Sequence, residues 1–274
     1  MLKGKKIAVI GAGHMGAALI GGILRAKLTS PKMIVATRRN PDALRALKSA
    51  WKTDTTTDNR RAVAGTDIVI LAVKPQMSPA VLRELGPAIT EKQLIISIMA
   101  GITTDSIEKK LGKPCPIVRS MPNTPCLVDA GATAVAAGAH AGEKELALAE
   151  KIFSSVGTVV TLPETALDAV TGLSGTGPVY IFMVVEAMID GGVKMGIPRA
   201  TAAKLAAQTV AGAAKLIIET GKHPAILKDE VTTPAGTAIN AIHTLEAKGL
   251  RSMLIDAVAT ATQRSQELSR LYAD

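Results

Sequence analysis

The chain has 274 residues, of which 47% are hydrophobic and only 2% aromatic, and its formal net charge is +9 at pH 7. This length has room for two domains of ordinary size, each with an aliphatic core rich in Ala and Gly. The positive charge would suit nucleic acid, but no Lys/Arg block is longer than a pair and few aromatic side chains could stack on bases. The composition therefore favours a basic protein that attracts anionic small molecules.

The cysteines and the apolar runs indicate in which cellular compartment we expect the protein. Cys115 and Cys126 have neither C-x-x-C spacing nor a neighbouring His, so we expect reduced structural thiols and no metal site. The longest apolar run, 179–185, stops at Glu186 and is far shorter than the ~20 residues that a membrane span needs. No apolar N-terminal segment is followed by a cleavage site. The sequence predicts a cytoplasmic protein without a membrane segment.

A glycine-rich loop near the N-terminus carries the first functional signal. Residues 7–10 (IAVI) have the pattern of a strand buried on both faces, and 17–27 that of a helix. Between them lies G-x-G-x-x-G, with Gly11 suited to the tight turn, Gly13 to backbone approach by a pyrophosphate and Gly16 to close helix packing. The alternative is an ordinary Gly-rich turn. The context favours dinucleotide binding at the helix N-terminus, by Gly11, Ala12, Gly13, His14, Met15 and Gly16.

The end of the next strand indicates which dinucleotide is bound. Residues 33–36 read as that strand, and an NAD site usually has an acidic residue there, about 20 positions past the glycine loop. This chain has Thr37, Arg38 and Arg39 instead. A hydroxyl and two guanidinium groups suit a 2′-phosphate, whereas the alternative is a solvated arginine pair. We therefore expect NADPH as the cofactor, with NADH bound at lower affinity.

Five further apolar runs predict strands that alternate with helices, at 67–73, 94–98, 115–119, 132–136 and 158–162. This alternation is typical of a doubly wound parallel sheet, in which ligands bind beyond the carboxyl ends of the strands. The residues expected there beside the cofactor are Ala72, Val73, Lys74, Pro75 and Ala100.

The pattern changes after Leu162. Periodic Ala, Leu, Val, Ile and Met stretches predict helices at 168–173, 178–190, 199–220, 238–248 and 250–271, and no alternating strand run is present. Helix 178–190 is apolar nearly all round, and a small domain can hardly bury it alone. We therefore predict a nucleotide-binding domain at 1–162 and a helical domain at 163–274 that packs against a second subunit.

Several long, irregular strings resemble pyrroline-5-carboxylate reductase, and the resemblance covers essentially the whole chain. The strings are DAVTGLSGTGPVY (168–180), EAMIDGGV (186–193), GIPR (196–199), LAAQT (205–209), HPAILKDEV (223–231) and LEAKGLR (245–251). The resemblance implies an α/β fold with an N-terminal Rossmann-type doubly wound sheet followed by an all-helical dimerisation domain, often in a ring of dimers. It also implies NADPH-dependent reduction of 1-pyrroline-5-carboxylate to L-proline, the last step of proline biosynthesis.

The resemblance assigns further residues to the site. It places Asn59 at the adenosine end of the cofactor and Asn123 near the cofactor, with Ser174, Gly175 and Thr176 at the nicotinamide end. The family loop Pro-Gly-Gly-Thr-Thr reads Pro-Ala-Gly-Thr-Ala at 234–238 here. The second threonine is credited in the family with a hydrogen bond near the substrate nitrogen. Either Thr237 replaces it or that hydroxyl is dispensable.

Helix-start chemistry points to the same loop as a carboxylate site. The backbone N–H groups of Gly236, Thr237 and Ala238 open a helix and suit an anion, although Thr237 can also act as a plain N-cap. In the family these groups reach the site from the partner subunit. The candidates for catalysis are Thr237, Ser174 and Lys74.

The residue content of the helical half favours an imine over a carbonyl substrate. Reduction of a ketone needs a proton donor beside the developing alkoxide, but no Lys, Arg or His occurs between Pro163 and Gly192. A protonated imine already attracts hydride, so positioning suffices. Two alternatives are a related imine reductase or hydroxyacid dehydrogenase, and a non-catalytic NADP(H)-sensing module.

Overall fold

The computed structural model describes residues 2–272, and its chain divides into two compact units. The first comprises Met1–Thr176 with Ala259–Asp274, and the second comprises Gly177–Val258. Helix α12 (Leu250–Leu271) begins in the second unit and ends in the first. Because the two units are defined by compactness alone, they do not test the domain boundary expected between residues 162 and 163, which stays a prediction.

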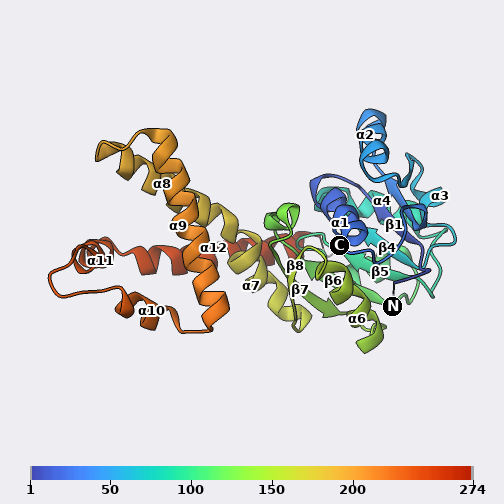
Figure 1. Cartoon of the computed structure of the whole chain (residues 1–274). Coiled ribbons are helices and arrows are strands. Elements are labelled where there is room, and N and C mark those ends of the chain that lie inside the picture. The colour runs from blue at the N-terminus through green and yellow to red at the C-terminus, as the bar shows by residue number, and fades with distance from the viewer. Residues whose placement is uncertain (1, 273–274) are drawn as a thin grey trace. The chain divides into compact units, whose positions relative to one another are not determined.

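The first unit contains one eight-stranded sheet (Figure 1). Its strands are β1 (Ile7–Ile10), β2 (Ile34–Thr37), β3 (Asp54–Thr56), β4 (Ile68–Leu71), β5 (Leu94–Ser97), β6 (Ile117–Met121), β7 (Gly131–Ala137) and β8 (Gly157–Thr161). Their order is β3-β2-β1-β4-β5-β6-β7-β8, so the chain reverses direction across the sheet between β1 and β4. That switch point is where doubly wound sheets bind ligands.

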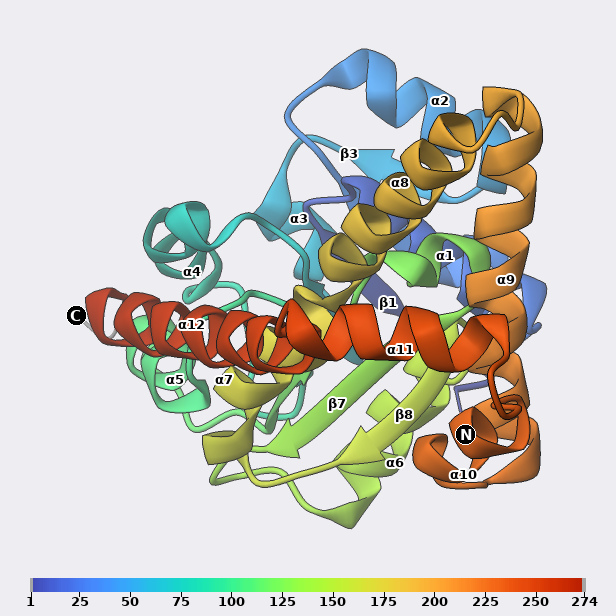
Figure 2. The ribbon, with the colours of Figure 1, turned by 90° about the vertical axis from the view of Figure 1, so that its left-hand side faces the viewer.

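The sheet is parallel from β3 to β6, as expected, but β7 pairs antiparallel with β6. Strand β8 pairs parallel with β7, and Figure 2 shows the two side by side. The chain passes from β6 to β7 through a short 3₁₀ turn, which is too short for a parallel crossover. Strand β3 was not predicted, because Asp54-Thr55-Thr56 is polar and lies at the edge of the sheet.

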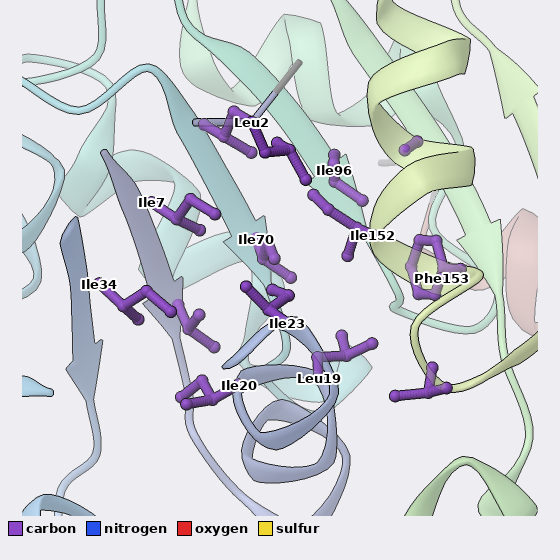
Figure 3. Close-up of a cluster of buried hydrophobic side chains, with 14 of the residues drawn as sticks. Leu2, Ile7, Leu19, Ile20, Ile23, Ile34, Ile70, Ile96, Ile152 and Phe153 are labelled. Atoms are coloured by element: carbon purple, nitrogen blue, oxygen red, sulfur yellow. The ribbon is translucent and has the colours of Figure 1, made fainter. Parts of the chain in front are cut away.

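Helices cover both faces of the sheet. They are α1 (His14–Arg25), α2 (Pro41–Trp51), α3 (Asn59–Val63), α4 (Ser78–Leu85), α5 (Thr104–Leu111) and α6 (Glu143–Phe153). Alternate residues of β1 belong to two buried clusters: Ile7 and Val9 pack with α1, α2 and α6, whereas Ala8 and Ile10 pack with α3, α4 and α5. Figure 3 shows part of the first cluster, where Ile70 of β4 lies close to Ile23 of α1. This two-sided burial makes the carboxyl edge of the sheet a rigid base.

The helical part follows the last strand. Its helices are α7 (Leu167–Val170), α8 (Gly177–Lys194), α9 (Arg199–Thr220), α10 (Pro224–Glu230), α11 (Thr237–Ala247) and α12. The expected bounds of α9 and α12 are confirmed. A π-helical turn at Thr171–Gly175 interrupts the expected helix 168–173. Helix α8 continues through two glycines to Lys194, and the short helix α10 lies outside the helices predicted from the sequence.

Helix α8 is exposed within one chain, and none of its residues is buried. Phe182 and Met183 are each more than 60% exposed. Within residues 2–272, the helical stretch Glu164–Lys194 is long and apolar enough to cross a membrane by length and composition, although it carries Glu186 and Asp190. The apolar run 179–185 counted from the sequence is shorter than this helical stretch, because small and polar residues interrupt the apolar residues of the stretch.

Candidate functional site

The glycine loop lies at the switch point of the sheet, with the geometry that its sequence predicts. Gly11 has φ +87°, and a Cβ added there would lie 2.6 Å from Cγ1 of Val73 and 3.0 Å from the carbonyl oxygen of Ala72. A Cβ on Gly16 would lie 3.2 Å from the carbonyl oxygen of Gly11. At Gly13 the nearest atom to such a Cβ is 3.9 Å away. The loop therefore packs tightly on its inner side and offers open space at Gly13.

The N-terminus of α1 suits an anion. Among residues 2–272, no side chain caps α1 and no acidic residue stands in its first turn. Gly13 is the N-cap, and His14, the first helical residue, is exposed. Free N–H groups and the helix dipole both favour negative charge at this position. The residues present thus fit the pyrophosphate of a dinucleotide.

Thr37 ties the end of β2 to the glycine loop. The residue is 1% exposed, and Oγ1 accepts a hydrogen bond of 3.2 Å from the N–H of Gly11. Its carbonyl oxygen accepts from the N–H of Ala12 at 2.7 Å. Arg38 and Arg39 follow as exposed residues before α2. Thr37 thus holds the loop in place, and a 2′-phosphate contact from these three residues stays a prediction.

The neighbouring strand ends supply the other residues expected beside the cofactor. The N–H of Ala72 donates to the carbonyl of Ile10 at 2.8 Å, which holds the end of β4 next to the glycine loop. Lys74 is exposed and Pro75 half-buried directly after it. Ala100 follows β5 and is half-buried. Because these strands are parallel, their carboxyl ends share one edge of the sheet.

Asn59 begins α3, which follows β3 at the same edge. It is half-buried, and its Nδ2 donates a hydrogen bond of 3.1 Å to Oε2 of Glu84. The side chain is therefore oriented by a neighbouring helix. Its expected contact with adenosine stays a prediction.

Two chain segments meet beyond the end of β6. Asn123 is 8% exposed, its Nδ2 donates to the carbonyl of Ser174 at 3.1 Å, and its Oδ1 accepts from the N–H of Ala132 at 2.9 Å. Gly175 lies beside Met121, since a Cβ there would be 2.6 Å from the Met121 methyl group. The π-helical turn therefore rests on the same edge of the sheet as the glycine loop.

The hydroxyl groups of Ser174, in this turn, and of Thr176, directly after it, donate to backbone carbonyls nearby. Oγ of Ser174 donates to the carbonyl of Val170 at 3.2 Å, and Oγ1 of Thr176 donates to the carbonyl of Thr171 at 3.0 Å. Each oxygen keeps lone pairs that can accept a hydrogen bond. A catalytic role for Ser174 stays a prediction.

A buried charge cluster lies next to the π-helical turn, and sequence reasoning missed it. Arg119 of β6 has a side chain 5% exposed and lies 3.4 Å from carboxylate oxygens of both Glu164 and Asp168. Asp168 also accepts hydrogen bonds from Ser265 at 2.8 Å and Ser269 at 3.2 Å. The cluster therefore joins β6, α7 and the end of α12. The sequence signal that could have revealed this cluster is an arginine inside an apolar strand, because a buried cation needs partners of opposite charge.

Glu164 extends the cluster to α5. Its Oε1 accepts from the N–H of Thr104 at 2.8 Å, and its Oε2 accepts from the Thr104 hydroxyl at 2.6 Å. Both carboxylates next to Arg119 thus have further hydrogen-bond donors, as buried ionic groups require.

The expected substrate loop lies in the second unit, at the start of α11. Gly236 is the N-cap, so Thr237 is the first helical residue and the alternative of an N-capping Thr237 is wrong. A Cβ on Gly236 would lie 2.3 Å from Oγ1 of Thr233, and Ala235 has φ +57°, where glycine is favoured. Among residues 2–272, no side chain caps α11. Its first N–H groups, including that of Ala238, suit an anion.

The first unit thus brings together most of the residues predicted for the site. The glycine loop, Thr37, Ala72 and Val73 are in contact, Asn123 contacts Ser174, and Gly175 lies beside Met121. The residues Gly236, Thr237 and Ala238 belong to the second unit.

The cysteines have a structural environment. Cys115 and Cys126 are buried and unpaired, and burial raises the pKa of both thiols. Raised pKa values make thiols poor nucleophiles at neutral pH. Among residues 2–272, no group of three or more His, Cys, Asp or Glu side chains is arranged to hold a metal ion.

Comparisons with known proteins give consistent results. Residues 164–268 match a family model described as pyrroline-5-carboxylate reductase dimerisation, and residues 6–101 match one described as NADP oxidoreductase coenzyme F420-dependent. A pyrroline-5-carboxylate reductase of Methanosarcina acetivorans is 46% identical over 269 residues, which are 98% of this chain and 100% of the relative. One from Escherichia coli is 39% identical over 266 residues, with 97% and 99% covered.

Solved structures resemble the whole chain. A pyrroline-5-carboxylate reductase from Coxiella burnetii has a TM-score of 0.91 and 39% identity, and the match covers 97% of this chain and 98% of that one. A pyrroline carboxylate reductase from Plasmodium falciparum, solved with NADP bound, has a TM-score of 0.88 and 28% identity, with 98% and 100% covered.

Proposed function

Because the chain belongs to the pyrroline-5-carboxylate reductase family, we propose that it reduces 1-pyrroline-5-carboxylate to L-proline with NADPH, the last step of proline biosynthesis. The observation that carries this proposal is the edge of the sheet where the glycine loop and the π-helical turn both lie. One segment suits a dinucleotide, and the other bears the string that is most specific to the family.

The chain's own residues account for cofactor binding. The first turn of α1 holds the pyrophosphate, and Arg38 with Arg39 selects the 2′-phosphate, which gives NADH a lower affinity. Bound NADPH supplies the hydride. Residues at the neighbouring strand ends, Ala72, Lys74 and Ala100, orient the cofactor along the edge of the sheet.

Catalysis in this proposal is positioning. The segment from Glu164 to Gly192 contains no Lys, Arg or His that could act as a general acid beside the π-helical turn. An imine protonated by solvent needs no such donor, because its carbon is already electron-poor. Ser174 and Thr176 therefore line and orient the reacting groups rather than transfer a proton.

The substrate carboxylate is assigned to the start of α11. The N–H of Gly236 donates to the carbonyl of Thr233 at 3.1 Å, so the carboxylate is assigned to the N–H groups of Thr237 and Ala238, where the helix dipole favours an anion. The Thr237 hydroxyl is assigned to the substrate nitrogen, in place of the family threonine that is alanine at position 238.

The exposed apolar face of α8 supports a homodimer, and we extend this proposal to a ring of dimers. A second subunit would remove Phe182 and Met183 from water, at about 25 cal/mol per Å² of apolar surface. Insertion of α8 into a membrane is disfavoured, because Asp190 would cost about 2.5–3.5 kcal/mol at a bilayer centre and Glu186 adds a second charge. We assign the dimer to the cytoplasm.

A substrate panel tests the proposed function. NADPH oxidation is followed with 1-pyrroline-5-carboxylate, a six-membered cyclic imine and 2-keto acids, each at saturating cofactor. We expect turnover of the pyrroline and formation of L-proline. Turnover of keto acids alone would indicate a hydroxyacid dehydrogenase, and tight NADPH binding without turnover would indicate a sensing module.

A further inference from the structure

We infer that Asn123 is a positioning residue for this reaction, rather than a ligand of the cofactor. It acts by holding the π-helical turn Thr171–Gly175 at the carboxyl edge of the sheet. This inference rests on the proposed reduction of a cyclic imine, and it assigns to Asn123 a task different from the cofactor contact expected from sequence.

The contacts of Asn123 are directed into the protein. Nδ2 donates to the carbonyl of Ser174 at 3.1 Å and Oδ1 accepts from the N–H of Ala132 at 2.9 Å, with 8% of the residue exposed. One amide thus joins the π-helical turn to β7. A buried amide used at both ends in this way leaves little of its surface for a cofactor.

The backbone under Asn123 is rigid. Pro122 and Pro125 restrict the chain on either side, and the carbonyl of Asn123 accepts from the N–H of Cys126 at 3.1 Å, in the 3₁₀ turn that follows. The side chain therefore starts from a fixed position, and its hydrogen bond can impose a position on the turn.

The turn that it holds has a geometry that needs support. The N–H of Thr176 donates to the carbonyl of Thr171 at 2.8 Å, five residues back, so one more residue is wound into this turn than an α-helix would hold. Such π-helical turns are rare and occur often at functional sites. Relaxation to an α-helix would rotate the following residues by about 100° about the helix axis. Ser174 would then face a different direction.

The segment before the turn is held by the same strand. Asp168 lies 3.4 Å from Arg119 of β6 and accepts a hydrogen bond of 2.8 Å from Ser265. Strand β6 and the residues after it thus hold the chain before the π-helical turn, at Asp168, and within the turn, at Ser174. A displacement of about 1 Å in a positioning group can lower a rate about 100-fold.

The test compares Asn123→Ala with Gln93→Ala, a matched control. Gln93 is also a buried amide, 4% exposed, and its Nε2 donates to the carbonyls of Val63 and Thr66 at 2.8 and 2.9 Å. It precedes β5 and so lies at the opposite edge of the sheet. Both substitutions remove an amide that joins two segments, but only Asn123 contacts the π-helical turn.

Two measurements are made on the full-length protein in its native oligomeric state. For Asn123→Ala we expect kcat with the imine to fall about 10-fold or more while the Kd of NADPH changes less than about 2-fold. In the unliganded protein we expect amide hydrogen exchange at residues 171–176 to accelerate about 10-fold or more. Gln93→Ala should leave both values close to those of the unsubstituted protein.

Three results would overturn the inference: an unchanged kcat, a loss confined to the Kd of NADPH, or an equal loss of kcat in Gln93→Ala. If Asn123→Ala does not fold, Asn123→Asp replaces it, because it keeps Oδ1 for Ala132 and removes only the donor to Ser174. Absence of imine turnover in the unsubstituted protein would refute the proposed function instead, and the exchange measurement would still decide whether Asn123 holds the turn.

Discussion

Thr37 and Asn123 are two polar residues whose hydrogen bonds hold loops in place at the carboxyl edge of the sheet, where we propose that the cofactor binds. Thr37 Oγ1 accepts from the glycine loop, and Asn123 bridges the π-helical turn to β7. Both residues are buried. The exposed Arg38 and Arg39, which follow Thr37, carry the positive charge that suits a 2′-phosphate.

The double substitution Arg38→Ala with Arg39→Ala tests cofactor selection. We expect the KM of NADPH to rise about 10-fold or more, since charge-assisted hydrogen bonds to phosphate are lost, while that of NADH changes less than about 2-fold. Steady-state kinetics with each cofactor measures the difference. Arg45→Ala, which removes a paired and exposed arginine of α2, is the control. Equal weakening of both cofactors would show that these arginines do not recognise the 2′-phosphate.

Thr237→Val tests the hydroxyl assigned to the substrate nitrogen. Valine keeps the backbone N–H and the branched shape but removes the hydroxyl, so we expect kcat/KM for the imine to fall about 10-fold, the effect of one lost hydrogen bond to a charged group. Thr244→Val changes another hydroxyl of α11, which donates to the carbonyl of Asn240, and should leave kcat/KM unchanged. If Thr237→Val turns over the imine at an unaltered rate, the hydroxyl has no catalytic part.

At the scale of elements, the cluster around Arg119 connects segments that are distant in sequence. It fixes α7 and the end of α12 to β6, and through Glu164 it also holds the start of α5. The chain segments that precede and follow the second unit in the sequence are thereby both anchored to β6. A single buried cation has this effect because each of its carboxylate partners accepts other hydrogen bonds.

Arg119→Met measures the contribution of this cluster. The substitution keeps an unbranched side chain but leaves Glu164 and Asp168 without their cation, so we expect the free energy of unfolding to fall by about 3–5 kcal/mol. Urea denaturation followed by circular dichroism gives the value. Arg25→Met removes an arginine from an exposed pair with Asp129 and should cost about 1 kcal/mol or less for that pair. Similar losses in the two variants would show that burial gives Arg119 no special weight.

At the scale of the whole molecule, the main feature is the apolar surface of α8, whose exposure to water is unfavourable in a single chain. Phe182 is 64% exposed and Met183 65% exposed, on a helix without a buried residue. Exposed apolar surface of this extent indicates an interface. Membership in a family whose dimerisation model matches residues 164–268 makes a second copy the occupant that we propose.

Phe182→Glu tests the dimer. A charge at this exposed apolar position of α8 would have to be buried unpaired in the dimer, so we expect a monomer by sedimentation velocity together with loss of imine turnover. Val128→Glu, at a residue 75% exposed in the first unit, should remain a dimer. A dimeric and active Phe182→Glu would place the subunit contact elsewhere.

Much of the fold followed from residue patterns. Apolar runs predicted β1, β4 and β5, and the bounds of α9 and α12 were predicted to the residue, because hydrophobic period and helix punctuation are local properties. The polar edge strand β3 and the antiparallel step at β7 were not predicted. Pairing direction depends on how the connection between strands folds, and an edge strand lacks the apolar pattern of a buried one.

By itself the sequence determined the nucleotide loop, the two-part organisation and the family. These depend on short spacings and on strings of consecutive residues, which are the same whether or not the chain is folded. The tertiary structure alone decided the roles of Thr37, Asn123 and Arg119. The hydrogen bonds between Thr37 and Gly11, between Arg119 and its two carboxylates, and between Asn123 and Ser174 join residues 26 to 51 positions apart along the chain. Such partners become neighbours only when the sheet brings the ends of separate strands to one edge.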